Sequence, residues 1–328
     1  MLIVKNESDN PFFNHAAEEY MMESFEEECF MLWINRPSIL IGRNQNTIAE
    51  INMEYVKENN ITIVRRPSGG GTVFNDYGNM NFTFISKVED TSFADFKRFA
   101  YPVIDGLKKL SIDAEFSGRN DITIEGKKIS GNAQYKHRNK VLHHGTLLFS
   151  ASMSNLSSAL NVRPIKLESN GVESVASRVT NISEHLKEPM TLKEFKDFLT
   201  KHMVEICDSS IFYEFSQKDL EGINKIMNEK YATWEWNFGK SPKFTLCNEH
   251  KYAGGILEVN LNVDKGIIKE IKFYGDFFGR KELFILEKVL EGVKHEKEAL
   301  FDALKDYEVN DFMNNITKEN LIECILGY

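Results

Sequence analysis

The 328-residue sequence predicts an α+β protein in which helices flank a mainly antiparallel sheet, followed by a small α+β unit. Helical and strand-like segments are mixed without the regular βαβ alternation of a doubly wound parallel sheet. Short apolar runs separated by turn signals in residues 114–151 indicate antiparallel hairpins. The sequence changes character after the polar, Pro- and Gly-containing stretch near residue 240. We therefore expect one domain over residues 1–242 and a smaller one over 243–328.

The first domain begins with alternating short strands and helices. Asn10 and Pro11 are a typical helix entry, and Pro37 separates two apolar runs. We expect, in order, a strand at 2–5, a helix within 10–28, two strands within 29–46, a short helix at 52–60 and strands at 61–66, 72–76 and 78–87.

The remaining elements follow from the same signals. Residues 92–111 form an amphipathic helical pattern with a kink expected near Pro102. The stretches EGKK and KHRNK mark the turns of the hairpin region. We further expect helices at 191–206 and 217–231, strands at 251–263 and 267–278 around a turn at 264–266, and helices from there to the end of the sequence.

Composition narrows the class of protein. Hydrophobic residues make up 42% and charged residues 27%, which is ordinary for a globular chain with a packed core. The formal net charge of −9 argues against general nucleic-acid binding. The four cysteines are far apart without a CxxC spacing, so we expect no disulfide framework or zinc site and a reducing, cytoplasmic setting. No signal peptide or membrane-spanning segment is predicted.

The stretch RRPSGGG at residues 65–71 is the strongest local signal. Three glycines let the backbone adopt positive φ and approach a ligand, while successive N–H groups and an arginine can bind an anion. The motif is not a P-loop, because no GK[ST] follows, and it is not a dinucleotide fingerprint, because a strand follows the glycines. A glycine-rich turn with surface arginines is the alternative.

A second cluster is GRNDITIEGKKISGNAQ at residues 118–134. Residues 128–131 alternate as a strand does, so we expect Lys128 and Ser130 to share one face, and the small residues after Ser130 leave room for a ligand. A lysine there can reach a phosphate oxygen. Six basic residues between positions 119 and 140 predict a local positive patch that suits a small anion: Arg119, Lys127, Lys128, Lys136, Arg138 and Lys140.

A third cluster is HHGTLLFS, in which His143 and His144 begin a buried strand. Adjacent histidines without a third ligand at suitable spacing are not a zinc signature, so no metal is assigned to them.

These three segments, with RRPSGGG extended to RRPSGGGTVFNDYGNMNFTFI, resemble the signature segments of the lipoate–protein ligase family, which has the biotin/lipoate ligase-like fold. The resemblance extends to WINRPSILIGRNQN and SVASRVTNI, and GGILEVNLNVDKGIIKEIKFYGDFF is similar to the family's accessory C-terminal domain. One departure is Asn75, where the family often has histidine, so no role is carried over to that position.

The resemblance implies that residues 1–242 form a catalytic domain and 243–328 an accessory domain. It implies that ATP, with Mg²⁺, activates lipoate to lipoyl-AMP, and that the lipoyl group then passes to an acceptor lysine as an amide. The implied acceptors are lipoyl-domain proteins, namely dehydrogenase E2 subunits or the glycine-cleavage H protein. We expect a monomer without nucleic-acid or membrane partners.

The resemblance also implies roles for individual residues. Lys128 is the expected catalytic residue, Asp121 is a candidate Mg²⁺ ligand, and lipoate is expected to contact Lys128, Gly70 and His144. Trp33, Phe82 and Phe84 are candidates for the apolar wall, although core packing is the favoured interpretation of each. The residues expected to bind ATP or lipoyl-AMP are Arg66, Ser68, Gly69, Gly70, Gly71, Thr72, Val73, Phe74, Asn120, Asp121 and Lys128.

Two alternatives remain open. A lipoyl or octanoyl transferase of the same fold works without ATP through a cysteine thioester, but no cysteine lies between Cys29 and Cys207, where all three segments fall. A non-catalytic acyl-carrier-binding protein could also retain the fold.

Overall fold

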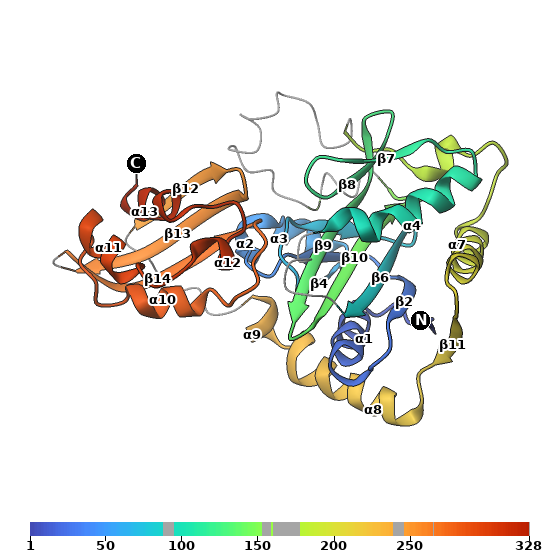
Figure 1. The fold of residues 1–328 in the computed structure, drawn as a ribbon, viewed down its shortest axis with the longest axis horizontal. Coiled ribbons are helices and arrows are strands. Elements are labelled where there is room, and N and C mark those ends of the chain that lie inside the picture. Colours follow the sequence, from blue (N-terminus) through green and yellow to red (C-terminus); the bar gives the residue numbers. More distant parts are fainter. Residues whose placement is uncertain (88–94, 153–158, 160–177, 239–245, 265, 328) are drawn as a thin grey trace.

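A computed structural model describes residues 1–87, 95–152, 159, 178–238, 246–264 and 266–327 (Figure 1). Its centre is an eight-stranded sheet in the order β11-β1-β2-β6-β10-β9-β8-β7. Neighbouring strands run antiparallel except β1, which is parallel to both β2 and β11. The strands are β1 (Leu2–Lys5), β2 (Cys29–Ile34), β6 (Asn79–Lys87), β7 (Ala114–Ser117), β8 (Asp121–Ile124), β9 (Lys127–His137), β10 (Lys140–Leu148) and β11 (Ile211–Glu214).

A second, three-stranded sheet carries the glycine loop. Its order is β4-β3-β5, and β3 is parallel to β4 and antiparallel to β5. The glycines therefore lie in the connection from β4 to β5. The elements are β3 (Ser38–Ile41), α2 (Thr47–Glu50), α3 (Met53–Glu58), β4 (Thr62–Arg65) and β5 (Val73–Asn75).

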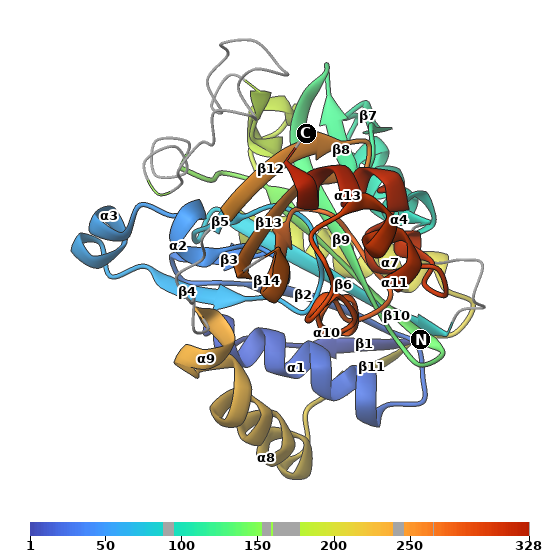
Figure 2. The same cartoon turned by 90° about the vertical axis from the view of Figure 1, so that its left-hand side faces the viewer.

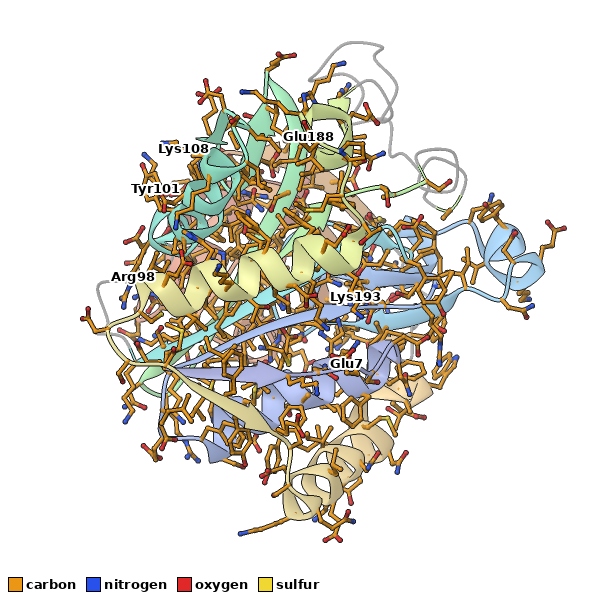
Figure 3. The ribbon with its side chains drawn as sticks, turned by 90° about the vertical axis from the view of Figure 1, so that its right-hand side faces the viewer. Glu7, Arg98, Tyr101, Lys108, Glu188 and Lys193 are labelled. Carbon is orange, nitrogen blue, oxygen red and sulfur yellow. The ribbon has the colours of Figure 1, made fainter. Side chains whose placement is uncertain are left out.

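Helices cover both faces of the large sheet, because alternate strand residues point to opposite sides. Phe30, Phe82 and Phe84 pack with residues of α4 (Phe96–Lys109) and α7 (Leu192–Ile206) in the main core cluster. Figure 3 shows α7 lying across this side of the sheet. On the other face, Met31, Trp33 and Ile85 pack against α1 (Pro11–Ser24). Beyond α1 lie α8 (Gln217–Ile226), a π-helical turn (Met227–Tyr231) and α9 (Trp234–Asn237).

The C-terminal residues form a separate antiparallel sheet with its own apolar core. Its strands, in the order β12-β13-β14, are β12 (Leu246–Tyr252), β13 (Gly255–Asp264) and β14 (Ile267–Gly275). Helices pack against this sheet (Figure 2). They are α10 (Phe284–Leu290), α11 (Lys297–Ala303), α12 (Val309–Phe312) and α13 (Lys318–Leu326).

The predicted fold class is confirmed, and the differences are local. The first helix ends at Ser24, before the glutamates at 26–28, and α2 was not predicted. The predicted strand at 251–263 contains the end of β12, a turn and most of β13, because Ala253 and Gly254 reverse the chain between the paired residues Tyr252 and Gly255. The domain boundary predicted near residue 240 lies within residues 239–245, which are outside the described residues. None of the described helices has the length and apolar character needed to cross a membrane.

Candidate active site

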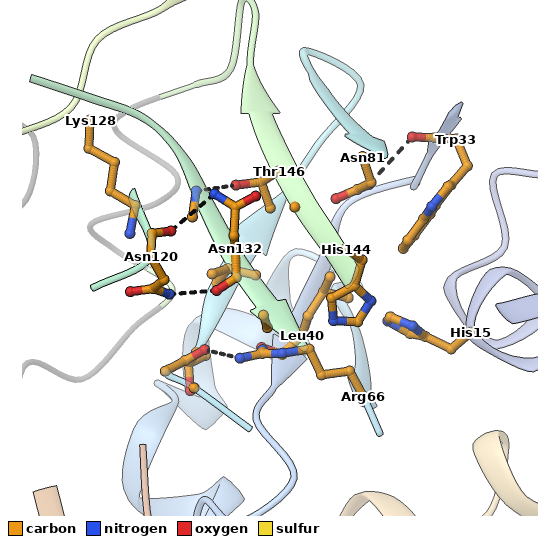
Figure 4. Close-up of a pocket in the computed structure, with 17 residues that line it drawn as sticks. His15, Trp33, Leu40, Arg66, Asn81, Asn120, Lys128, Asn132, His144 and Thr146 are labelled. Carbon is orange, nitrogen blue, oxygen red and sulfur yellow. Dashed lines mark hydrogen bonds between the residues drawn. The ribbon is translucent and has the colours of Figure 1, made fainter. Parts of the chain in front are cut away.

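One pocket of about 120 Å³ lies where β9 and β10 of the large sheet approach the glycine loop and α1 (Figure 4). Figure 4 places Lys128 and Asn120 on one side of the pocket and Trp33, His144 and His15 on the other. The lining residues are His15, Trp33, Leu40, Arg66, Gly70, Gly71, Thr72, Val73, Asn81, Asn120, Lys128, Gly131, Asn132, Ala133, His144, Gly145 and Thr146.

Arg66 determines the shape of the glycine loop. Its guanidinium group donates to the carbonyl oxygens of Leu40 (2.9 Å), Gly69 (2.9 Å) and Gly71 (2.6 Å), and its Nε donates to Ser68 Oγ (3.1 Å). Burial lowers the pKa of Arg66 to about 10, which leaves it charged at neutral pH. A buried cation therefore holds the loop together from inside and supplies positive charge to the pocket wall.

The loop glycines are required by conformation and by close packing. Gly70 has φ of 88°, a conformation that side chains with a Cβ rarely adopt. A Cβ on Gly69 would lie 2.4 Å from the carbonyl oxygen of Phe277. Phe278, from the C-terminal unit, is buried and packs with Phe96 of α4. Gly69 thus leaves room for the segment after β14, while Gly70 and Gly71 line the pocket.

Lys128 lies at the start of β9, and its Nζ is 2.8 Å from Asp121 Oδ1 on the neighbouring β8. A shift in register between Ile122 and Thr123 inserts an extra residue into β9 opposite them. The prediction that Lys128 and Ser130 share a face is therefore wrong. Lys128 lines the pocket, whereas Ser130 is buried outside the lining set and accepts from Asn132 Nδ2 (3.2 Å).

A chain of hydrogen bonds orients the amides beside Lys128. Asn132 Nδ2 donates to the Asn120 carbonyl (3.0 Å), and Asn120 Nδ2 donates to the Asn132 carbonyl (2.5 Å). Asn132 Oδ1 is 3.1 Å from Nε2 of the fully buried His143. Burial lowers the pKa of His143 well below its ordinary value, so its neutral ring donates from Nε2 and accepts from Gln134 at Nδ1. His143 is therefore a structural support for Asn132 and Asn120.

The opposite side of the pocket rests on a buried carboxylate, Glu18 of α1. Glu18 accepts from Nδ1 of His15 (2.8 Å), Nδ1 of His144 (2.9 Å) and Oγ1 of Thr83 (2.6 Å). Burial disfavours its ionised form, but its electrostatic interactions and hydrogen bonds with His144 and His15 hold the pKa of Glu18 below its ordinary range. His144 Nε2 in turn is 2.6 Å from Ser68 Oγ.

The ligating atoms of His15, Glu18 and His144 lie within 4.8 Å of one another, close enough for a shared metal ion. Their hydrogen bonds explain the arrangement without one, since each histidine can donate its Nδ1–H to a carboxylate oxygen of Glu18. The network runs from Glu18 through His144 and Ser68 to Arg66, and so connects α1 to the glycine loop.

Asn75, the departure from the family pattern, is fully buried among other asparagines. Its Oδ1 accepts from Asn81 Nδ2 (2.9 Å) and Asn35 Nδ2 (3.3 Å). Because Asn81 lines the pocket, Asn75 supports the wall from behind and does not itself line it.

The structure brings most of the predicted site residues to this pocket. Arg66, Gly70, Gly71, Thr72, Val73, Asn120, Lys128 and His144 line it. Ser68, Gly69 and Phe74 do not: Ser68 and Gly69 brace the loop, and Phe74 is buried in an apolar cluster behind it. Asp121 does not line the pocket either, but it forms an ion pair with Lys128, which does. Trp33 lines the wall, whereas Phe82 and Phe84 belong to the core.

The predicted positive patch is divided. Lys140 is buried and donates to the carbonyl of Met22 (3.1 Å) and to that of Phe25 at the end of α1. Arg119 donates to the carbonyl of Gly254 and stacks over Phe278, 4.9 Å from the ring centre. Both cations stabilise tertiary contacts, so the patch of six is not a single anion surface.

His15, Glu18, Asn81 and Asn132 were not singled out from the sequence. Each is a polar residue with an exposed fraction of 2% or less, and a buried polar residue needs a partner inside the protein or a ligand. His15 and Glu18 are three residues apart on a helix and so share one face, next to the small residues Ala16 and Ala17. That spacing is visible in the sequence, but only the fold shows that the face is buried.

Comparisons with known proteins show the family of the chain. Residues 10–204 match the lipoyl protein ligase A/B catalytic domain, and residues 241–325 match the bacterial lipoate protein ligase C-terminus. The chain is 43% identical to lipoate-protein ligase LplJ of Bacillus subtilis, over 99% of this chain and 100% of that protein.

Solved structures show the same relationship. The crystal structure of P. falciparum LipL1 in complex with lipoate is 27% identical, with a TM-score of 0.81, and the match covers 100% of this chain and 99% of that one. A bipartite lipoate protein ligase from Thermoplasma acidophilum, described with its E2 lipoyl domain, is 25% identical with a TM-score of 0.65, covering 75% of this chain and 98% of that one. The chain belongs to the lipoate–protein ligase family.

Proposed function

We propose that this protein activates lipoate with ATP to lipoyl-AMP and transfers the lipoyl group to a lysine of a lipoyl-domain protein. The observation that carries the proposal is the single pocket in which Lys128 and Asn120 lie on one side and Trp33 and His144 on the other. A polar end suits a carboxylate and phosphate, and a wall with Trp33 and Leu40 suits an acyl chain.

In the first step, a lipoate carboxylate oxygen attacks the α-phosphorus of ATP and pyrophosphate leaves. Two anions must approach each other, so positive charge at the reacting atoms lowers the barrier. Lys128 Nζ supplies it, and its ion pair with Asp121 holds it at the pocket wall before ligand binds. Arg66 adds charge through the glycine loop, whose Gly70 and Gly71 line the pocket.

In the second step, the acceptor lysine amine attacks the acyl carbonyl, an amide forms and AMP leaves. Lys128 stabilises the negative charge that develops on the carbonyl oxygen. The residues present fit Mg²⁺: the Asp121 carboxylate adjoins Asn120, whose Nδ2 is bonded to Asn132, and phosphates of ATP complete the set. Bound there, Mg²⁺ would neutralise phosphate charge.

The thioester route of a transferase fits this pocket poorly. None of the described residues that line it is a cysteine. Cys29 is buried in the apolar cluster beneath α1, and burial raises the pKa of its thiol to about 12. A thiol in that environment is a poor nucleophile at neutral pH.

The test is mass spectrometry of the products formed from the purified protein, ATP, Mg²⁺ and R-lipoate, with and without apo H protein. Without the acceptor, we expect lipoyl-AMP as the product. With the acceptor, we expect the mass of the H protein to increase by one lipoyl group. Modification only with supplied lipoyl-AMP would indicate a transferase without activation. No modification under either condition would favour an acyl-carrier-binding protein.

A further inference from the structure

The side of the pocket farthest from Lys128 contains a buried polar atom whose partner is missing. His15 lines the pocket with an exposed fraction of 0%, and its Nε2 has no hydrogen-bond partner among the described residues. Its other nitrogen, Nδ1, is 2.8 Å from Glu18 Oε2. A buried polar atom left unpaired is costly, so an arrangement that keeps one inside a ligand pocket points to the ligand as its partner.

The hydrogen bonds around His15 determine which kind of partner it needs. Glu18 is ionised and can only accept, so the proton of the neutral imidazole is on Nδ1. Burial also lowers the pKa of His15, which favours the neutral ring. Nε2 of this pocket-lining residue therefore carries an unshared lone pair, and it requires a donor.

Neighbouring rings hold the imidazole in place. The His15 ring stacks on Tyr231 with centroids 6.0 Å apart, and it meets Trp33 edge-on at 5.3 Å. With the Glu18 bond, these contacts orient the lone pair independently of any ligand.

We propose that His15 recognises the distal end of the acyl substrate and favours a medium-chain acid that carries a hydrogen-bond donor there. This inference rests on the proposed function, in which the substrate carboxylate lies at Lys128 and the chain end lies toward His15 and Trp33. A thiol or hydroxyl meets the requirement. The reduced dithiol form of lipoate carries such donors, whereas the ring sulfurs of the oxidised form and the methyl end of octanoate do not.

The experiment is calorimetric titration of the full chain, without ATP, with octanoate and with 8-hydroxyoctanoate, two acids that differ by one hydroxyl. We expect the hydroxy acid to bind about fivefold more tightly, the effect of one net hydrogen bond. Dihydrolipoate, titrated anaerobically, should likewise bind more tightly than oxidised lipoate.

Two variants separate the lone pair from the rest of the ring. His15→Asn can keep a donor for Glu18 but has no atom at the position of Nε2, so its preference should fall to about unity. His15→Gln can place a carbonyl oxygen near that position and should keep a preference for the hydroxy acid. Equal affinities in the wild type, or the same preference in wild type and His15→Asn, would overturn the inference.

The design distinguishes this inference from the proposed function. Pyrophosphate release with ATP and lipoate is measured separately. Discrimination between the two acids without pyrophosphate release would keep the role of His15 and reject the ligase activity. Pyrophosphate release without discrimination between the two acids would keep the ligase activity and reject the role of His15.

Discussion

Arg65 and Arg66 are adjacent in the sequence, yet their guanidinium groups bind two separate sets of backbone carbonyls. Arg66 donates to the carbonyls of Leu40, Gly69 and Gly71 around the pocket. Arg65 makes six side-chain hydrogen bonds to the segments at residues 42–47 and 236–237. One arginine therefore shapes the site, while its neighbour ties the β4–β3 region to α9.

Arg65→Ala should reduce stability strongly, because it leaves several buried carbonyls without donors. We expect a loss of about 3–5 kcal/mol in the free energy of unfolding, measured by urea denaturation. Arg98→Ala, at an exposed position on α4, is the matched control and should change stability by less than about 0.5 kcal/mol. Equal effects of the two substitutions would contradict the structural role of Arg65.

Lys128→Ala should abolish adenylate formation and leave the fold intact, because the side chain lies at the pocket wall and not in the core. A decrease of roughly 100-fold or more in pyrophosphate release is expected for the loss of one charge-stabilising group. Lys127→Ala removes the exposed neighbouring charge and should retain activity within about twofold. Wild-type rates in Lys128→Ala would reject its assignment as the catalytic residue.

Gly70→Ala tests the glycine loop against a site with similar backbone strain. Gly70 and Gly126 have φ of 88° and 76°, so alanine costs about 1–2 kcal/mol at either position. Only at Gly70 does a Cβ meet neighbours, 3.1 Å from Arg66 Nη2 and 3.2 Å from the Phe278 ring, whereas Gly126 faces open space. We expect Gly70→Ala to lose somewhat more stability than Gly126→Ala, because close contacts add to the strain, and Gly70→Ala alone to lose about tenfold or more in kcat/KM for ATP. Parallel losses of activity would show that strain alone accounts for the effect.

Stability should fall as the pH is lowered from 7 to 5. Burial depresses the pKa values of His143 and His15, so below the ordinary histidine pKa of about 6.5 the unfolded chain binds more protons than the folded one. Each histidine that stays neutral contributes a slope of about 1.4 kcal/mol per pH unit. Glu18 affects stability in a lower pH range. Because its pKa is depressed in the folded protein, the stability that it adds is lost only below about pH 4.3, the ordinary pKa of a glutamate.

His143→Gln should therefore make the slope between pH 5 and 6 shallower by about 1.4 kcal/mol per pH unit, as measured by denaturant unfolding at fixed pH values. The variant should be less stable at pH 7, because the stacking of the ring on Phe99 is lost. An unchanged slope would mean that His143 is protonated in the folded protein or that other groups dominate.

Much of the fold could be predicted from local signals. The strands at 2–5 and 78–87 and the helix that begins after Asn10 follow from apolar runs and entry residues, which act over a few neighbouring positions. The bulge in β9 could not be predicted, because an extra residue in a strand is defined only by how the strand pairs with its neighbour, here β8. For the same reason the partners of Lys128 and Ser130 were decided by strand pairing.

The sequence by itself determined the α+β class and the presence of a glycine-rich loop beside two arginines, since both rest on residue type and short spacing, while the resemblance to a family singled out Lys128 among six basic residues. Tertiary structure decided what each charge binds. In the folded protein, Arg65 and Lys140 donate to backbone carbonyls, and Lys128 forms an ion pair with Asp121. His15 and Glu18 of α1 are buried beside His144 of β10, which is 126 residues from Glu18 in the sequence. Burial and distant partners set the strength of a charge and the pKa of an ionisable group, and neither is a property of neighbouring residues in the chain.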